Sequence, residues 1–76
     1  MKISDLKKMQ ERVPFRPFSI HLANGDVLQV QDPEFLSINP QVPDLFSLWV
    51  GREWNLVDLS SVNRVRVSPK GEKESK

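Results

Sequence analysis

Residues 18–30 read FSIHLANGDVLQV, and their pattern is that of a β-hairpin. Phe18, Ile20 and Leu22 alternate with serine, histidine and alanine, which is the two-residue period of a strand with one apolar face. Asn24-Gly25 comes directly after this strand and is a strong turn signal. The stretch therefore predicts two antiparallel strands, and it sets the fold class expected for the rest of the chain.

The length of the loop decides which residues of this hairpin face each other. A two-residue loop would place glutamines opposite the apolar residues of the first strand. A three-residue loop over residues 23–25 instead pairs Phe18 with Val30 and Ile20 with Leu28. The hydrophobic pattern favours the three-residue loop, with its glycine in the left-handed region.

Short apolar runs separated by turn residues continue beyond the hairpin. Gly51-Arg52 predicts a second hairpin with a two-residue loop, because glycine suits the first loop position of the turns that hairpins prefer. This loop places Trp49 opposite Trp54 and Ser47 opposite Leu56. The second strand of the first hairpin is expected at about residues 26–31. Further strands are expected at about 35–38, 45–50, 54–58 and 62–67, with a single turn over 58–61.

The beginning of the chain predicts a short amphipathic helix. Its apolar residues recur at spacings of three and four, at Ile3, Leu6, Met9 and Val13. Ser4-Asp5 is a suitable start, because either side chain can accept a hydrogen bond from a free backbone N–H. Pro14 is expected to end the helix, since the residue before a proline is pushed out of the helical region. The expected helix spans about residues 4–12.

Pro14-Phe15-Arg16-Pro17-Phe18 joins this helix to the first strand. Two prolines three residues apart, with an arginine nearby, are also the pattern of an SH3-domain ligand. We interpret the segment as a rigid elbow, because the prolines fix two φ angles where a helix ends and a strand begins. Phe15 is then expected to pack between the helix and the strands, and Arg16 to point outward or reach a carboxylate.

A helix and five or six short strands cannot bury a flat sheet in a chain of this length. Curling the antiparallel strands into a small open barrel of the SH3-like or Sm-like kind makes one core and removes most free edges. We therefore expect a mainly β fold with one short N-terminal α-helix, as a single domain over residues 1–67. Residues 68–76 lack large apolar side chains and are expected to form a disordered charged tail.

The composition argues against catalysis and against a bound cofactor. The 76 residues include no cysteine and one histidine, so disulfides, thiolate chemistry and a protein-only zinc site are not expected. His21 has no carboxylate or nucleophile at a spacing that identifies a catalytic partner, and the three glycines form no phosphate-binding pattern. We expect a protein that is not an enzyme and uses no cofactor or metal.

The sequence shows no targeting or membrane segment. MKISDLKKMQER has basic residues without an apolar run behind them, so it does not resemble a signal peptide. No stretch approaches the roughly 18 apolar residues that a membrane span requires. We expect a cytoplasmic protein that makes no membrane contact.

The net charge of +1 is unevenly distributed, with basic ends and an acidic middle. A nucleic-acid-binding domain usually carries the reverse, a basic stripe on its folded body. A basic face can form here only if the first helix and the last strand lie together. Lys7, Lys8, Arg64 and Arg66 would then bind RNA or DNA, and a nucleic-acid-binding Sm-like barrel is the alternative function.

The second hairpin is apolar on both faces, whereas a strand in a barrel wall needs apolar side chains only on the face toward the core. Trp49, Trp54 and Leu56 form the face that points away from the predicted core. Either the N-terminal helix covers them, or they form an exposed patch that binds a second copy of the chain or another protein. The leading hypothesis is a non-catalytic interaction or assembly module, in which homo-oligomerisation would stabilise a very short chain.

Four segments occur in an order that resembles a family of short, uncharacterised bacterial proteins opening with a P-F-R-P-F motif. The segments are Pro14-Phe15-Arg16-Pro17-Phe18, Ile20-x-Leu22-x-Asn24-Gly25, Val30-x-x-Pro33-Glu34-Phe35 and Val57-Asp58-Leu59-x-x-Val62. The resemblance covers about residues 14–65 and implies the domain boundaries and a bacterial cytoplasm, but no activity. The order of elements is also similar to Sm-like RNA-binding barrels, although the uridine-binding steps of that family, aspartate-x-x-asparagine and arginine-glycine, are absent.

Overall fold

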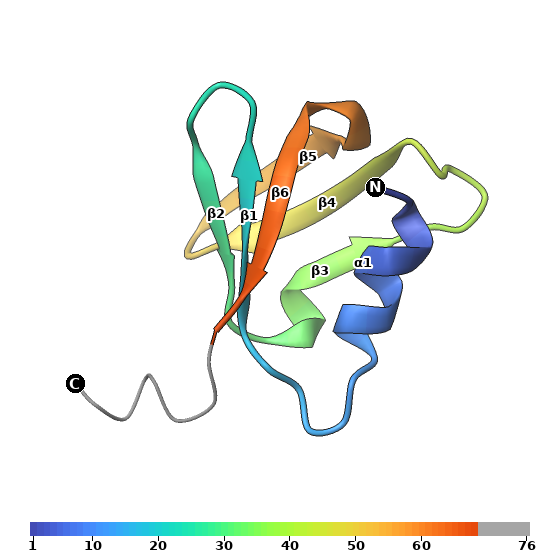
Figure 1. The fold of residues 1–76 in the computed structure, drawn as a ribbon, viewed down its shortest axis with the longest axis vertical. Helices are drawn as coiled ribbons and strands as arrows, with labels where there is room; N and C mark the ends of the chain where they lie inside the picture. Colours follow the sequence, from blue (N-terminus) through green and yellow to red (C-terminus); the bar gives the residue numbers. More distant parts are fainter. Residues whose placement is uncertain (69–76) are drawn as a thin grey trace.

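The computed structural model describes residues 1–68, and Figure 1 shows how their elements are arranged. These residues form one helix, six strands and two 3-10 turns. The elements are α1 (Ile3–Gln10), β1 (Phe18–Leu22), β2 (Val27–Val30), η1 (Pro33–Phe35), β3 (Leu36–Ile38), β4 (Leu45–Val50), β5 (Glu53–Asp58), η2 (Leu59–Ser61) and β6 (Val62–Val67). The prediction of a mainly β fold with one short N-terminal helix is therefore confirmed.

The strands form two antiparallel three-stranded sheets, ordered β2-β1-β6 and β3-β4-β5, which do not close into a barrel. The chain passes from the first sheet to the second at η1 and returns to the first at η2. At η1 the Asp32 carboxylate accepts a hydrogen bond from the backbone N–H of Glu34 at 3.0 Å. Because Pro33 has no N–H to donate, the β2 ladder ends at this turn. The strands expected in one curled barrel are thus divided between two sheets.

The hydrophobic core lies between the two sheets, which cross each other in Figure 1. Each sheet contributes the inward-facing residues of its strands, and α1 contributes one fully buried leucine. The buried residues are Leu6, Phe18, Ile20, Val30, Leu36, Phe46, Leu48 and Val57. The apolar alternation in the sequence therefore marks the core face of the strands, as the two-residue period requires.

The register of the first hairpin is the one that the hydrophobic pattern favours. Phe18 pairs with Val30 and Ile20 pairs with Leu28. Gly25 has a φ of 97°, and its left-handed conformation is what a three-residue loop needs. The prediction of this loop is confirmed.

The second hairpin also has its predicted register. Trp49 lies opposite Trp54, and Ser47 lies opposite Leu56. Gly51 has a φ of 61°, whereas Arg52 has a negative φ, which matches a two-residue turn with glycine in its first position. Strand β4 and the last strand β6 have the predicted bounds.

The helix α1 differs from its prediction at both ends. The Asp5 carboxylate accepts a hydrogen bond from the backbone N–H of Lys2 at 3.0 Å, so the cap precedes Ser4. The helix ends at Gln10, before the effect of Pro14 on its neighbour applies. Val13 is 91% exposed and does not continue the apolar stripe, so a longer helix would bury nothing more.

The elbow between α1 and β1 packs against the core. The rings of Phe15 and Phe18 have centroids 5.9 Å apart, and Phe15 is half-buried beside the core. The Arg16 guanidinium donates to the backbone carbonyl of Ser68 at 3.1 Å, and the Ser68 N–H donates to the Pro17 carbonyl at 3.0 Å. Arg16 therefore binds the end of β6, and neither points into solvent nor reaches a carboxylate as expected.

The predicted charged tail lies outside the described residues, except for Ser68. Within residues 1–68, the single helix is too short and too polar to cross a bilayer.

Candidate functional site

The outer face of the β3-β4-β5 sheet carries a set of exposed apolar side chains. Because side chains alternate along a strand, the inward positions of β4 and β5 are occupied by Phe46 and Val57, and their neighbours point away from the core. Trp49, Trp54 and Leu56 are 46%, 54% and 60% exposed. We call these three residues the tryptophan face.

The helix α1 does not cover the tryptophan face. Leu6 is fully buried in the core, and Ile3 and Met9 pack beside it. The Gln10 side-chain amide donates to the backbone carbonyls of Pro33 and Leu36, which fixes the end of α1 against η1 and β3. Of the two alternatives left open by the sequence, the structure therefore has the exposed patch.

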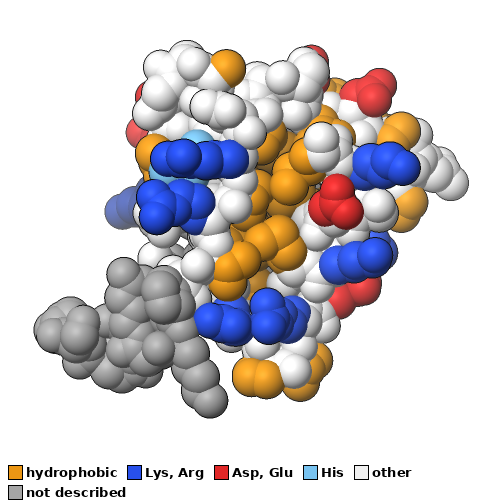
Figure 2. Space-filling model, in the orientation of Figure 1, with side chains coloured by type: hydrophobic (Ala, Val, Ile, Leu, Met, Phe, Trp, Pro, Cys, Tyr) orange, Lys and Arg blue, Asp and Glu red, His pale blue; other side chains and the backbone are white. Residues whose placement is uncertain are grey.

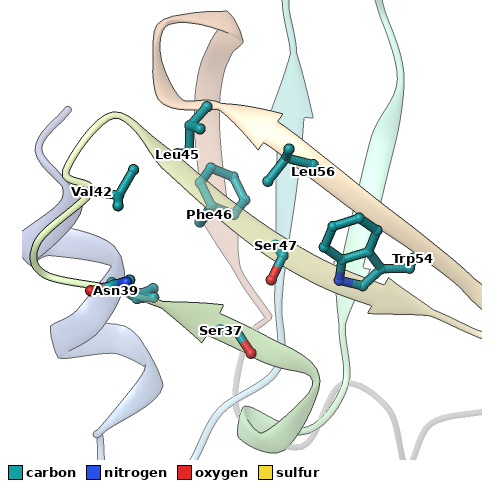
Figure 3. Close-up of a pocket in the computed structure, with 9 residues that line it drawn as sticks. Ser37, Asn39, Val42, Leu45, Phe46, Ser47, Trp54 and Leu56 are labelled. Atoms are coloured by element: carbon teal, nitrogen blue, oxygen red, sulfur yellow. The ribbon is translucent and has the colours of Figure 1, made fainter.

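A shallow hollow of about 260 Å³ adjoins the tryptophan face (Figure 3). Trp54 and Leu56 form one side of it from β5, and Val42 lies on the opposite side in the loop before β4 (Figure 3). The remaining lining residues come from β3, β4 and the loop between them, and they are Ser37, Ile38, Asn39, Leu45, Phe46 and Ser47. None of the lining residues is charged.

The lining of this hollow indicates which chemistry it can accept. Covering apolar walls is favourable, by about 25 cal/mol for each Å² of apolar surface removed from contact with water. The hydroxyls of Ser37 and Ser47 add polar groups to the floor, and these two residues face each other across β3 and β4. The hollow is therefore suited to an apolar side chain of a partner and offers nothing to neutralise an ionised ligand.

The opposite sheet presents a face of different chemistry. A second hollow of about 340 Å³ lies on the β2-β1-β6 sheet, and its lining contains no carboxylate. The lining residues are Ser19, His21, Val27, Gln29, Arg66, Val67 and Ser68. Arg64 lies opposite His21 in the strand register, so both predicted arginines belong to this face.

The four predicted nucleic-acid residues do not form one cluster. Figure 2 shows the Lys and Arg side chains in separate groups, with hydrophobic side chains between them. Arg64 and Arg66 lie on β6, whereas Lys7 and Lys8 lie on α1. The Lys7 ammonium is 3.0 Å from the Glu11 carboxylate, so part of the charge on α1 is already balanced.

A free strand edge is a feature that reasoning from the sequence missed. Strand β5 is the terminal strand of its sheet within residues 1–68. Half of the backbone N–H and C=O groups of a terminal strand point away from its neighbour and can pair with another strand. The alternating pattern of β5 predicts a strand, but no local signal indicates that it lies at an edge.

The end of β5 is fixed by a hydrogen-bonded carboxylate. Asp58 accepts from the backbone N–H of Ser60 at 2.9 Å and from the Ser60 hydroxyl at 2.8 Å. These hydrogen bonds, the backbone bond first, hold the pKa of Asp58 below its ordinary value. Asp58 thus caps η2, the predicted single turn before the last strand.

The described part of the chain contains no group of three or more His, Cys, Asp or Glu residues that could hold a metal ion. His21 has a polar neighbour, because its Nε2 is 3.1 Å from the Ser19 hydroxyl. This pair lies in the second hollow without a carboxylate beside it. The arrangement offers no triad of nucleophile, base and orienting acid.

Neither protein-family models, nor curated proteins, nor solved structures provide a match to this chain. The resemblance to a family of short bacterial proteins therefore stays a prediction.

Proposed function

We propose that the protein is a non-catalytic interaction and assembly module that binds a protein surface through the tryptophan face. The observation that carries the proposal is the exposure of Trp49, Trp54 and Leu56 on one side of one sheet. Tryptophan is enriched among the residues that contribute most to binding at protein interfaces. Exposed apolar side chains next to a hollow without charged residues are typical of such surfaces.

We also propose that the two sheets are a strongly opened version of an SH3-like or Sm-like barrel. The order of elements supports this assignment, since a one-turn connector, η2, precedes the last strand. That strand, β6, then pairs with β1, the first strand of the chain. Such barrels serve many unrelated functions, so the fold itself adds nothing to the functional argument.

A second candidate function is the binding of RNA or DNA by the β2-β1-β6 sheet. Its support is the hollow that contains Arg66, has Arg64 beside it and lacks a carboxylate. Phosphates bind to arginines at such sites, and the resulting affinity decreases steeply as the salt concentration rises. Lys7 and Lys8 would contribute only through the separate group of basic residues on α1.

The two candidates are separated by capture from an extract of the native cell at low and at high salt. Four immobilised forms are compared: the wild type, Trp49→Ser, Trp54→Ser and an Arg64→Ser/Arg66→Ser double variant. Each replaced side chain is exposed, so the core is preserved in all of them. Bound proteins are identified by mass spectrometry, and bound nucleic acid is detected separately.

Protein binding through the tryptophan face has a defined outcome. A stoichiometric protein is retained by the wild type at high salt and lost from both tryptophan variants. Capture of nucleic acid that is lost at high salt and in the arginine variant supports the second candidate. Equal capture by all four forms would refute both functions.

A further inference from the structure

We infer that β5 pairs edge to edge with β5 of a second copy, antiparallel about a two-fold axis at Asn55. This inference goes beyond the proposed function, because it adds a self-association through the backbone edge of β5 that does not use Trp49. The result is one continuous six-stranded sheet, in which the two tryptophan faces lie side by side. A two-fold contact of this kind closes on itself and yields a dimer instead of a fibre.

Strand β5 is the one edge in residues 1–68 without a device that prevents pairing. Its six residues pair with β4 without a bulge, and its charged residues, Glu53 and Asp58, stand at its ends. It contains neither lysine nor proline, which natural proteins place on edge strands to prevent association.

The other three edges are protected. Strand β6 carries Arg64 and Arg66 and has an irregular register with β1. Strands β2 and β3 are four and three residues long, and very short edges pair weakly. The end of β3 is also occupied by α1, since Gln10 donates to the Leu36 carbonyl.

The backbone geometry of the β4-β5 hairpin determines which groups face the free edge. In a two-residue hairpin the residues that flank the loop, here Val50 and Glu53, form a hydrogen-bonded pair. Pairs alternate along an antiparallel ladder between hydrogen-bonded and non-hydrogen-bonded. The backbone groups of Trp54 and Leu56 are therefore directed toward the free edge, available to a second strand.

The side chains select one register from those that the backbone permits. With the axis at Asn55, Trp54 lies opposite the partner's Leu56, and Arg52, in the loop directly before β5, comes beside the partner's Asp58. The row of side-chain pairs on the outer face then has two apolar pairs at its centre and an opposite-charge pair at each end. The same contacts occur twice, as two-fold symmetry requires.

The two neighbouring registers leave these side chains mismatched. Moving the axis to Trp54 places Arg52 opposite the partner's Leu56. Moving it to Leu56 places Trp54 opposite the partner's Asp58. On the outer face, each shift sets a charge against an apolar residue and separates Arg52 from the partner's Asp58. The outer-face pairs therefore favour the axis at Asn55, in which Glu53 lies opposite the partner's Val57 on the inner face.

A single introduced cysteine tests the register, because the chain has no cysteine of its own. Asn55 would face its own symmetry mate in a non-hydrogen-bonded pair with Cα atoms about 4.5 Å apart. A disulfide needs Cα atoms roughly 4.4–6.8 Å apart, so purified Asn55→Cys should form a disulfide-linked dimer. The control is Glu53→Cys, on the same face of β5, whose two copies would be about 13 Å apart.

The expected result is that Asn55→Cys crosslinks at least about tenfold faster than Glu53→Cys under the same oxidant, because pairing raises the local thiol concentration. Circular dichroism verifies that both variants are folded. Equal rates for the two variants would overturn the inference. Preferential crosslinking of Asn55→Cys to a different protein in a cell extract would also overturn it, because the edge would then serve another strand.

A second measurement uses no cysteine and keeps the β5 backbone unchanged. Sedimentation of the wild type over a wide range of concentration should show a monomer–dimer equilibrium. Arg52→Glu faces the partner's Asp58 and should weaken this dimer at low salt, whereas Arg64→Glu makes the same charge change on the other sheet and should not. A wild type that stays monomeric, or equal effects of the two variants, would contradict the inference.

Trp49→Ser separates a failure of this inference from a failure of the proposed function. Trp49 lies on β4, away from the β5 edge, so its loss should leave the crosslinking of Asn55→Cys unchanged. Absent crosslinking, with protein capture that still depends on Trp49, rejects the β5 pairing and leaves the proposed function standing. Crosslinking without any capture that depends on Trp49 and Trp54 rejects the proposed function and leaves the β5 pairing standing.

Discussion

Asp58 shows how a single side chain can end one element and begin another. It is the last residue of β5, and its carboxylate accepts two hydrogen bonds from Ser60 at the start of η2. These bonds favour the ionised form and lower the pKa of the carboxyl. A lowered pKa in the folded state means that the ionised carboxylate stabilises the protein above the ordinary carboxyl pKa, and that this stabilisation is lost as the pH falls through the lowered value.

Replacing Asp58 should therefore alter stability in a pH-dependent way. We expect Asp58→Ala to have a lower melting temperature than the wild type at neutral pH, because the cap of η2 is lost. The difference should shrink as the pH falls through the pKa of the folded state. Thermal melts followed by circular dichroism across the acid range measure this, with exposed Asp44→Ala as the control. A difference that is constant with pH would contradict the linkage.

Phe15 is the residue that decides how the elbow should be interpreted. Its ring is half-buried, with its centroid 5.9 Å from that of Phe18. We expect Phe15→Ser to lower the melting temperature, because it removes apolar contacts between the elbow and the core. Phe15→Leu retains most of these contacts and should lose less. An unchanged melting temperature in Phe15→Ser would favour a role of the segment in recognition.

At the scale of elements, local pattern and turn chemistry predicted most of the strands. The alternation Phe18-x-Ile20-x-Leu22 with its turn was sufficient for the register of the first hairpin, because a slip of one residue would expose the core face. The helix was predicted less well. Spacing alone placed Val13 on its apolar stripe, whereas the structure leaves Val13 exposed, since nothing packs on that position.

The docking of α1 depends on one buried leucine. Leu6 is 0% exposed and is the residue of α1 that enters the core. We expect Leu6→Ala to reduce the free energy of unfolding by about 2–5 kcal/mol, as for other buried leucines. Lys8→Ala, at an exposed position on the same helix, is the control and should have little effect. Urea titration measures both, and a small loss in Leu6→Ala would mean that α1 is not docked.

Gln10 makes the polar contact that completes this docking. Its amide donates to the carbonyls of Pro33 and Leu36, and nothing in the sequence distinguishes it from a solvent-exposed glutamine. We expect Gln10→Met, which keeps the length but removes the donor, to cost about 1–2 kcal/mol. Compared with the wild type, amide hydrogen exchange in this variant should accelerate more in α1 than in β1. Unchanged exchange in α1 would show that these hydrogen bonds do not hold the helix.

The whole molecule has two sheets whose outer faces differ in chemistry. One outer face carries Trp49, Trp54 and Leu56, and the other carries Arg64 and Arg66. A chain this short buries a modest core, so association through the apolar face would add to its stability. The proposed assembly would therefore bear on how the protein stays folded as well as on what it binds.

Association should be visible in the stability and fluorescence of the whole chain. We expect the melting temperature of the wild type to rise with protein concentration, because mass action favours the associated folded state. Quenching of tryptophan fluorescence by acrylamide should decrease over the same range, as Trp54 leaves solvent. A Trp54→Ser/Leu56→Ser variant is the control. Neither its melting temperature nor the quenching of its remaining Trp49 should change with protein concentration. Concentration-independent melting of the wild type would contradict the prediction.

Local sequence patterns were sufficient to predict the strands, both hairpin registers and the turn before the last strand. These features depend on the two-residue period, on glycines in the loops and on prolines, which act over a few residues. Three features became visible only in the folded molecule: the strands form two sheets, α1 packs beside β3, and β5 is an open edge that includes Trp54. The physical reason is that these choices depend on packing between residues far apart in the chain, and hydrophobic burial has no direction of its own.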